Sequence, residues 1–287
     1  MSAGPTQALL PFSVPVGSWA EHAVNFLLDH YDAPFQHFSA ALYAMIAALQ
    51  GALLAVPAPL MIGLLGLLAG WSAGLRAGLF AIGGLLLAHN MGLWHSTVTT
   101  LGLVVSAEVL VLVVGLPLGI LAARSDLVDR GLRPMLDLMQ TMPAFVYLIP
   151  AVMLFGLGLV PGVISTFIFS IPPLIRLTNL GIRQVPADLV EASEAFGATW
   201  LQTLAKVQLP VALPSIMAGV NQSIMLGLSM VVIAAMIGSG GLGKEVLEGI
   251  TRLQVGSGFE AGLAVVILAI VLDRITQGIG VRKRRRR

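Results

Sequence analysis

The sequence predicts an all-helical protein embedded in a membrane. Of its 287 residues, 57% are hydrophobic and only 10% are charged, and the mean hydropathy is +0.92, whereas soluble domains carry about 25% charged residues. The 32 glycines and 16 prolines fit this class, because neighbouring helices satisfy the backbone groups that such residues free in a membrane helix. The absence of cysteine excludes disulfides and thiolate metal sites.

Seven apolar stretches are long enough to cross a bilayer, which takes about 20 mostly apolar residues. The gaps between them carry most of the charged residues. An eighth stretch, 38–53, is also apolar but contains Tyr43 and Gln50 and runs into Pro57. The seven predicted spans are 54–73, 77–94, 97–123, 134–156, 159–179, 215–238 and 259–279.

The distribution of Lys and Arg predicts the orientation of these spans, because cytoplasmic loops are enriched in both residues. With the polar loop 188–214 placed inside, fourteen of the sixteen Lys and Arg residues fall on the inside, and only Lys244 and Arg252 remain outside. The C-terminus is therefore expected in the cytoplasm. Its basic tail, 281–287, is expected to touch anionic lipid, and nucleic acid is not expected as a partner.

The N-terminal segment 1–53 contains no Lys or Arg but several acidic residues, and a tail without positive charge crosses a membrane easily. Seven spans place the N-terminus outside, and eight place it inside. The favoured seven-span interpretation makes part of 19–53 one or two amphipathic helices at the outer surface. It leaves 54–280 as the transmembrane domain. The alternative makes 38–53 a true first span.

The loop 188–214 carries the strongest local signals. Pro186 is expected to end the preceding helix, and Asp188 is expected to cap a short helix over 189–196. Gly197 permits the positive φ that a sharp turn requires.

A second short helix is expected over 199–207, stopping before Pro210. The two helices would meet at an angle, with Glu191 and Glu194 exposed and with small side chains that allow close approach to a groove on a partner. Such a compact projection, held by both flanking spans, can transmit a movement of the partner to the transmembrane helices. The alternative is an ordinary solvated loop.

The spacing of residues within this loop carries a resemblance. Glu-Ala, Gly and Leu-Pro follow the pattern E-A-A-x3-G-x9-I-x-L-P, with Ser at the second Ala and Val at Ile. The pattern resembles the coupling loop by which the membrane subunits of ATP-driven bacterial importers grip their ATPase. The residues concerned are Glu191, Ala192, Ser193, Glu194, Gly197, Val207, Leu209 and Pro210.

A wider resemblance covers about 54–280 and is closest to the permease subunit of the quaternary-amine ABC importers of glycine betaine, proline betaine and choline. It implies the type I ABC importer permease fold and pairing with a second copy of the chain. It also implies a cytoplasmic ABC ATPase subunit, which binds the ATP, and a periplasmic or surface substrate-binding protein. The chain itself would need no cofactor and catalyse no reaction. The matching stretches are 115–125, 133–158, 171–199 and 206–243.

The glycine-rich run 238–243 is followed by Lys244 and fits G-x-G-x-x-G and, in part, G-x-x-x-x-G-K. It follows an apolar span rather than a strand, and Glu245 stands where Mg²⁺ binding needs Ser or Thr, so nucleotide is not expected. We expect a flexible turn. Gly240 and Gly241 would then belong to an outer gate or to the docking face for a binding protein, or would simply mark a helix end.

Three further residues are candidates for the path or its gate. Glu108 lies near the middle of a predicted span, where it would attract a quaternary ammonium or, as we favour, hydrogen-bond a neighbouring helix. Pro143 and Asn179 lie near expected helix breaks that would act as hinges beside the path or as simple kinks for packing. No residue cluster suggests a metal site, and no nucleophile–base pair suggests catalysis.

These observations predict the membrane subunit of an ATP-driven importer for a quaternary ammonium osmolyte, located in a bacterial cytoplasmic membrane. The alternative is a secondary transporter of a small osmolyte that is driven by an ion gradient. That class needs inward-facing charge pairs and a self-contained site, and the lone Glu108 argues against it.

Overall fold

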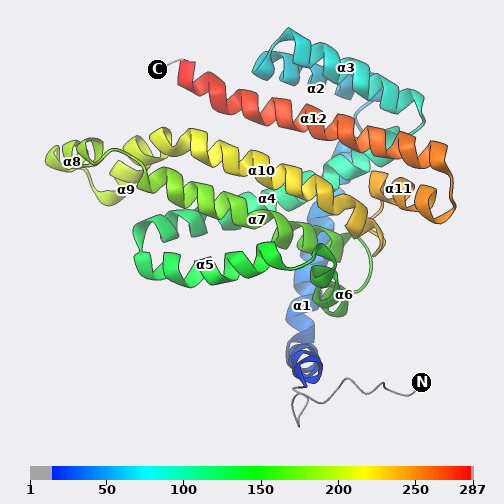
Figure 1. Ribbon diagram of the computed structural model, residues 1–287, viewed down its shortest axis with the longest axis horizontal. Coiled ribbons are helices and arrows are strands. Elements are labelled where there is room, and N and C mark those ends of the chain that lie inside the picture. Colours follow the sequence, from blue (N-terminus) through cyan, green and yellow to red (C-terminus); the bar gives the residue numbers. More distant parts are fainter. Residues whose placement is uncertain (1–14, 286–287) are drawn as a thin grey trace, which may run out of the picture.

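The computed structural model describes residues 15–285, and every regular element within that range is a helix. The all-helical fold class is therefore confirmed. Four long helices run roughly along the long axis of the molecule (Figure 1). They are α4 (Trp94–Arg124), α7 (Leu159–Arg183), α10 (Leu209–Ala235) and α12 (Val255–Arg285).

Helix α7 packs against both α4 and α10, and small residues bring the backbones close together. A Cβ on Gly119 of α4 would lie 2.6 Å from the Cβ of Thr178. A Cβ on Gly181 of α7 would lie 2.7 Å from the Cβ of Ser215. Small residues at helix contacts are typical of membrane proteins, where van der Waals packing drives association.

Five described helices are long and apolar enough to cross a membrane, or six if one bent pair counts as a span. The predicted spans 97–123, 159–179, 215–238 and 259–279 correspond to the four long helices. The fifth helix of sufficient length is Ala33–Leu54. The remaining predicted spans differ from the observed helices in ways that follow from their glycines and prolines.

The predicted spans 54–73 and 77–94 form a hairpin of two shorter helices, α2 (Ala58–Ala73) and α3 (Leu75–Asn90). Pro57 precedes the first helix, and Gly74, with φ 96°, joins the two. Each helix has 16 residues and is therefore about 24 Å long, shorter than a typical hydrocarbon core of about 30 Å. The hairpin lies alongside α12 (Figure 1).

The predicted span 134–156 is broken by a sharp bend near Pro143. The chain forms α5 (Asp126–Thr141), the 3₁₀ turn η1 (Ala144–Tyr147) and α6 (Leu148–Phe155), with a bend of 111° between α5 and the segment that follows. The residue before a proline is pushed out of the helical region, and Met142 accordingly has φ −69° and ψ 137°. Pro143 therefore ends α5.

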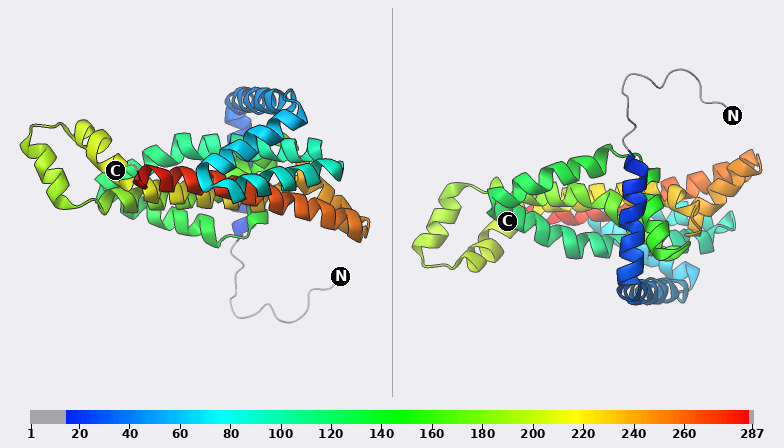
Figure 2. Two further views of the ribbon diagram at one scale, coloured as in Figure 1. Left: turned by 90° about the horizontal axis from the view of Figure 1, so that it is seen from above. Right: turned by 90° about the horizontal axis from the view of Figure 1, so that it is seen from below.

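Helix α1 (Val16–Leu54) crosses the long helices at a steep angle (Figures 1 and 2). Pro34 has no N–H to donate to the backbone carbonyl of the residue four positions earlier. The helix is therefore kinked at Tyr31, where φ is −127°. Ala33–Leu54 has the length and composition of a span, as the eight-span alternative requires. Its crosswise course, however, resembles the surface helix of the favoured interpretation.

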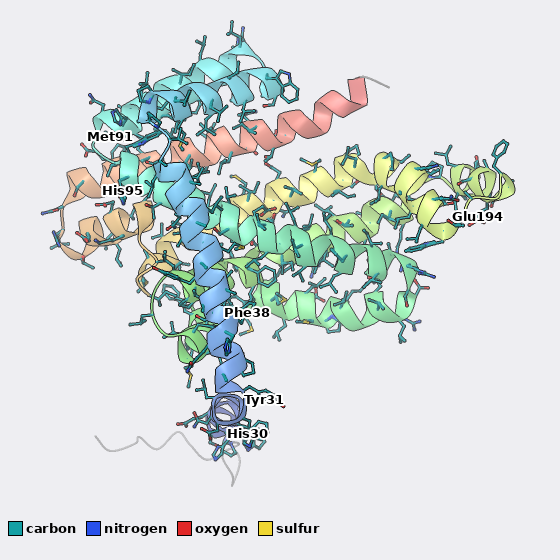
Figure 3. All side chains as sticks on the ribbon, turned by 180° about the vertical axis from the view of Figure 1, so that it is seen from behind. His30, Tyr31, Phe38, Met91, His95 and Glu194 are labelled. Carbon is teal, nitrogen blue, oxygen red and sulfur yellow. The ribbon has the colours of Figure 1, made fainter. Side chains whose placement is uncertain are left out.

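The two ends of the molecule differ in what they carry. Glu194 lies at one end and Met91 and His95 lie near the other (Figure 3). The short helix α11 (Gly241–Thr251) and the start of α12 lie at the same end as His95. The predicted basic tail 281–287 continues α12 as far as Arg285. Residues 1–14 and 286–287, which belong to the predicted terminal segments, lie outside the described residues.

Candidate functional site

The loop between α7 and α10 projects beyond both helices at one end of the molecule (Figures 1 and 2). It contains α8 (Ala187–Ala195) and α9 (Trp200–Thr203). No residue of α8 is buried. Its exposed side chains are therefore available to a partner.

Helix α8 begins two residues earlier than predicted. Pro186 occupies the N-cap position with φ −53° and ψ 133°, so the prediction that Asp188 is the N-cap is wrong. The pyrrolidine ring fixes φ near this value, which suits a helix start. Asp188 lies instead in the first turn, where its carboxylate interacts favourably with the positive end of the helix dipole.

Gly197 ends α8 in the conformation that the sequence predicts. Its φ is 77°, its N–H donates to the carbonyl of Glu194 (2.8 Å), and the N–H of Ala198 donates to the carbonyl of Ser193 (3.1 Å). This pair of bonds is the Schellman motif. A Cβ added at Gly197 would meet nothing within 4 Å, so the constraint within this chain is the backbone conformation alone.

The second helix of the loop does not stop before Pro210, and that prediction is wrong. Helix α9 continues through the π-helical turn Leu204–Gln208 into α10, giving one helix over Trp200–Ala235. The N–H of Leu209 reaches back to the carbonyl of Leu204, a five-residue step. The wider turn accommodates the proline, which lies at the start of α10 and lacks an N–H.

One contact joins the two short helices of the loop to each other, and a second joins the loop to the helix bundle. The hydroxyls of Ser193 on α8 and Thr203 on α9 are 2.9 Å apart. The guanidinium of Arg124, in the last turn of α4, lies 4.1 Å from the ring centroid of Trp200. Nothing in the local sequence pattern predicts the second contact, because the partners are far apart in the chain.

The outer surface of the loop is apolar with an acidic border. Phe196 is 92% exposed, Leu201 is 65% exposed and Leu189 is 45% exposed. Of the predicted coupling residues, five are exposed or half-buried on this projection and three are half-buried where it joins α10. The first group is Glu191, Ala192, Ser193, Glu194 and Gly197, and the second is Val207, Leu209 and Pro210.

Glu108 is buried between α4 and α10. The hydroxyl of Ser223 lies 2.8 Å from each carboxyl oxygen and donates to this group. No salt bridge to Glu108 is found in the described part of the chain. The arrangement matches the favoured expectation that Glu108 links two helices.

Asn179 belongs to a polar network between α5 and α7. Its amide donates to Asp129 (2.7 Å) and its carbonyl oxygen accepts from Arg183 (2.8 Å). Arg183 also pairs with Asp126 at 2.6 Å. Sequence reasoning selected Asn179 but missed the network, because its members are up to 57 positions apart. Pro143, the other hinge candidate, is exposed at the bend after α5.

The glycine-rich run packs closely against α4 at Gly241. Gly238, Gly240 and Gly241 have φ values of 87°, 77° and 70°. The hydroxyl of Thr100 accepts from the N–H of Leu242 at 2.8 Å, and a Cβ on Gly241 would lie 2.5 Å from that oxygen. An N–H that a phosphate would need is therefore already bonded.

The described residues contain no group of three or more His, Cys, Asp or Glu that could hold a metal ion.

Comparison with known proteins identifies the family. Residues 115–285 match the family described as binding-protein-dependent transport system inner membrane component. The chain belongs to this family. It is 50% identical over 267 residues to the glycine betaine/proline betaine transport system permease protein ProW of Escherichia coli (strain K12), covering 93% of this chain and 75% of ProW. It is 48% identical over 273 residues to the glycine betaine transport system permease protein OpuAB of Bacillus subtilis (strain 168), covering 95% and 97%.

A third relative and a solved structure agree with this assignment. The glycine betaine/carnitine transport permease protein GbuB of Listeria monocytogenes serotype 1/2a (strain 10403S) is 48% identical over 269 residues, covering 92% of this chain and 95% of GbuB. The methionine ABC transporter MetNI in an inward-facing conformation matches with a TM-score of 0.57 and 22% identity, over 64% of this chain and 93% of that chain. The latter match shows the fold, the type I ABC importer permease fold.

As a member of this permease family, the chain is a multi-pass membrane protein and a transport subunit without ATPase activity of its own. The family supports the ATP-driven interpretation and not the alternative of an ion-gradient-driven transporter. It also implies partners, an ATPase and a substrate-binding protein, since the transport system is binding-protein-dependent.

Proposed function

We propose that this permease imports glycine betaine and related quaternary ammonium osmolytes, using ATP that a separate cytoplasmic subunit hydrolyses. The observation that carries the proposal is the projecting loop, α8 to α9, in a chain about half identical to permeases named for glycine betaine. Proline betaine and carnitine appear in the names of two of these relatives. Choline is the further substrate that the sequence resemblance implies.

The loop surface suits a groove on the ATPase. Phe196 and Leu201 supply apolar contact area, and Glu191 and Glu194 border it with negative charge. Hot spots at protein interfaces are commonly aromatic residues surrounded by contacts that exclude water. We therefore assign Phe196 as the main anchor, a residue that the family pattern of the loop does not contain.

The permease is proposed to work as a homodimer with two ATPase copies and a periplasmic or surface binding protein. The loop then faces the cytoplasm, together with the C-terminus and the basic tail, which contacts anionic lipid. Residues 54–280 form the transmembrane domain. Residues 1–53 lie at the outer surface with the N-terminus outside, which the crosswise course of α1 supports (Figure 1).

Reconstitution tests the proposal. The permease, its genomic-neighbour ATPase and the binding protein are placed in proteoliposomes, and uptake of radiolabelled glycine betaine, proline betaine, carnitine and choline is measured with and without internal ATP. Uptake of glycine betaine that needs ATP, the ATPase and the binding protein is expected. Uptake driven by an ion gradient in the absence of the ATPase would overturn the proposal.

A further inference from the structure

A cavity of about 340 Å³ lies between α5 and α7. Sites for small molecules typically measure about 300–1,000 Å³, so this cavity is large enough for a compact solute. Its lining combines apolar side chains with both signs of charge. The polar lining residues are Asp129, Arg133, Asp137, Arg176, Asn179 and Arg183.

Two of these charges lie where charges are rare. Asp137 falls within α5, which together with the segment after the bend is apolar enough to be one broken span, and Arg176 falls within α7, a helix long and apolar enough to cross a membrane. Ionisable residues inside spanning segments usually mark substrate pathways. The bend of 111° follows α5 one turn beyond Asp137, and helices interrupted within the membrane commonly form substrate sites in transporters.

The polar groups of the cavity differ in how firmly they are held. Asp129 is buried and accepts from Arg133 and Asn179. Arg183 donates to Asp126, to Asn179 and to the carbonyl of Ala122 at 2.6–2.8 Å. These groups form a fixed floor, because they are hydrogen-bonded to one another around the buried carboxylate of Asp129.

The pair formed by Arg176 and Asp137 is different. The guanidinium lies 2.5 Å from the carboxylate, and 40% of the Arg176 side chain and 68% of the Asp137 side chain remain exposed. Arg176 also donates to the side-chain oxygen of Gln140 at 2.5 Å. An exposed ion pair stabilises a structure only weakly, so a solute carrying both charges can replace the internal partners at little cost.

We propose that this cavity is a transient site for a zwitterion within the permease. The carboxylate of the solute pairs with the guanidinium of Arg176, and its cationic group lies beside the carboxylate of Asp137. One internal ion pair is thereby exchanged for two, and the net charge of the cavity with its ligand stays unchanged. The inference rests on the proposed function, since betaines carry a carboxylate and a quaternary ammonium together.

Saturation-transfer NMR on the purified permease–ATPase complex in nanodiscs, without the binding protein, tests the site with glycine betaine as the probe. We expect weak binding to the wild-type complex. R176Q and D137N should each weaken it at least about tenfold, because each removes a charged partner. R176K should weaken it less, because the charge stays while the planar fork is lost. R130Q changes a cation of α5 that does not line the cavity, and binding should be unchanged.

The outcomes separate this site from the transport function. A wild-type complex that imports glycine betaine in proteoliposomes but shows no saturation transfer would overturn the site alone. Unchanged binding in R176Q, D137N and R176K would also overturn it, even if these variants had altered thermal stability or ATPase activity. A complex that binds through Arg176 and Asp137 but shows no ATP-dependent uptake would support the site and contradict the transport proposal.

Discussion

Gly197 offers the sharpest test of the coupling loop, because the structure separates two reasons for having glycine there. Its φ of 77° costs a residue with a Cβ about 1–2 kcal/mol, which corresponds to a factor of about 5–30 in an equilibrium. Asn visits this conformation more easily than other residues. No atom lies within 4 Å of an added Cβ, so the isolated permease offers no clash.

The replacements G197N, G197A and G197L therefore form a graded series. If only the turn matters, G197N should retain near-wild-type affinity for the ATPase, and G197A and G197L should both lose about 5–30-fold. If the ATPase also approaches closely, G197L should lose far more than G197A, and uptake should uncouple from ATP hydrolysis. Affinity is measured by biolayer interferometry on permease nanodiscs, and uptake per ATP is measured in proteoliposomes.

Membrane insertion and thermal stability of all three variants serve as the control, and we expect both to be intact. Full uptake and full ATPase affinity in G197L would refute the coupling role of this turn. Equal losses in G197N and G197A would refute the argument from backbone conformation.

Three further predictions follow from buried contacts. S193A leaves the buried hydroxyl of Thr203 without its partner and should cost about 1–3 kcal/mol, measured as weaker ATPase binding, whereas S193T should retain affinity. G241A places a Cβ 2.5 Å from a buried hydroxyl oxygen of α4, at a backbone φ of 70°. It should lower the free energy of unfolding of the permease by about 1–3 kcal/mol, measured by thermal denaturation. An unchanged melting temperature would contradict the packing argument. E108Q keeps a hydrogen bond to Ser223 and should retain glycine betaine uptake. E108L removes that bond and should lower the melting temperature of the permease. Loss of uptake in a stable E108Q variant would favour a role for Glu108 in the path.

Features that depend on neighbouring residues were predictable from sequence. The turn at Gly197 follows from the backbone freedom of glycine, and the four long helices follow from apolar runs that exceed the bilayer thickness. The exclusion of the glycine-rich run 238–243 as a nucleotide loop rests on the apolar span before it and stays a prediction. The close approach of Thr100 to this run was missed, because Thr100 belongs to a different helix.

Features that depend on distant contacts were missed. A helix break near Pro143 was expected, but the hydropathy of the run 134–156 does not give the size of the bend, 111°. The contact between Arg124 and Trp200 and the network of Arg183 join helices far apart in sequence. Spacing along one helix carries no information about such partners. The predicted helix end before Pro210 was wrong, because a π-helical turn can accommodate a proline that would otherwise end a helix.

The π-helical turn has a mechanical consequence. Because it joins α9 to α10 without a break, Trp200–Ala235 is one helix of 36 residues, about 54 Å long. One end of this lever lies in the projecting loop, and the other lies beside Ser239 and the glycine-rich run. A tilt of about 10° around its midpoint would move each end by about 5 Å in opposite directions. A displacement applied at Trp200 would therefore reach the far side of the bundle as a rigid rotation that keeps the helix's own backbone hydrogen bonds.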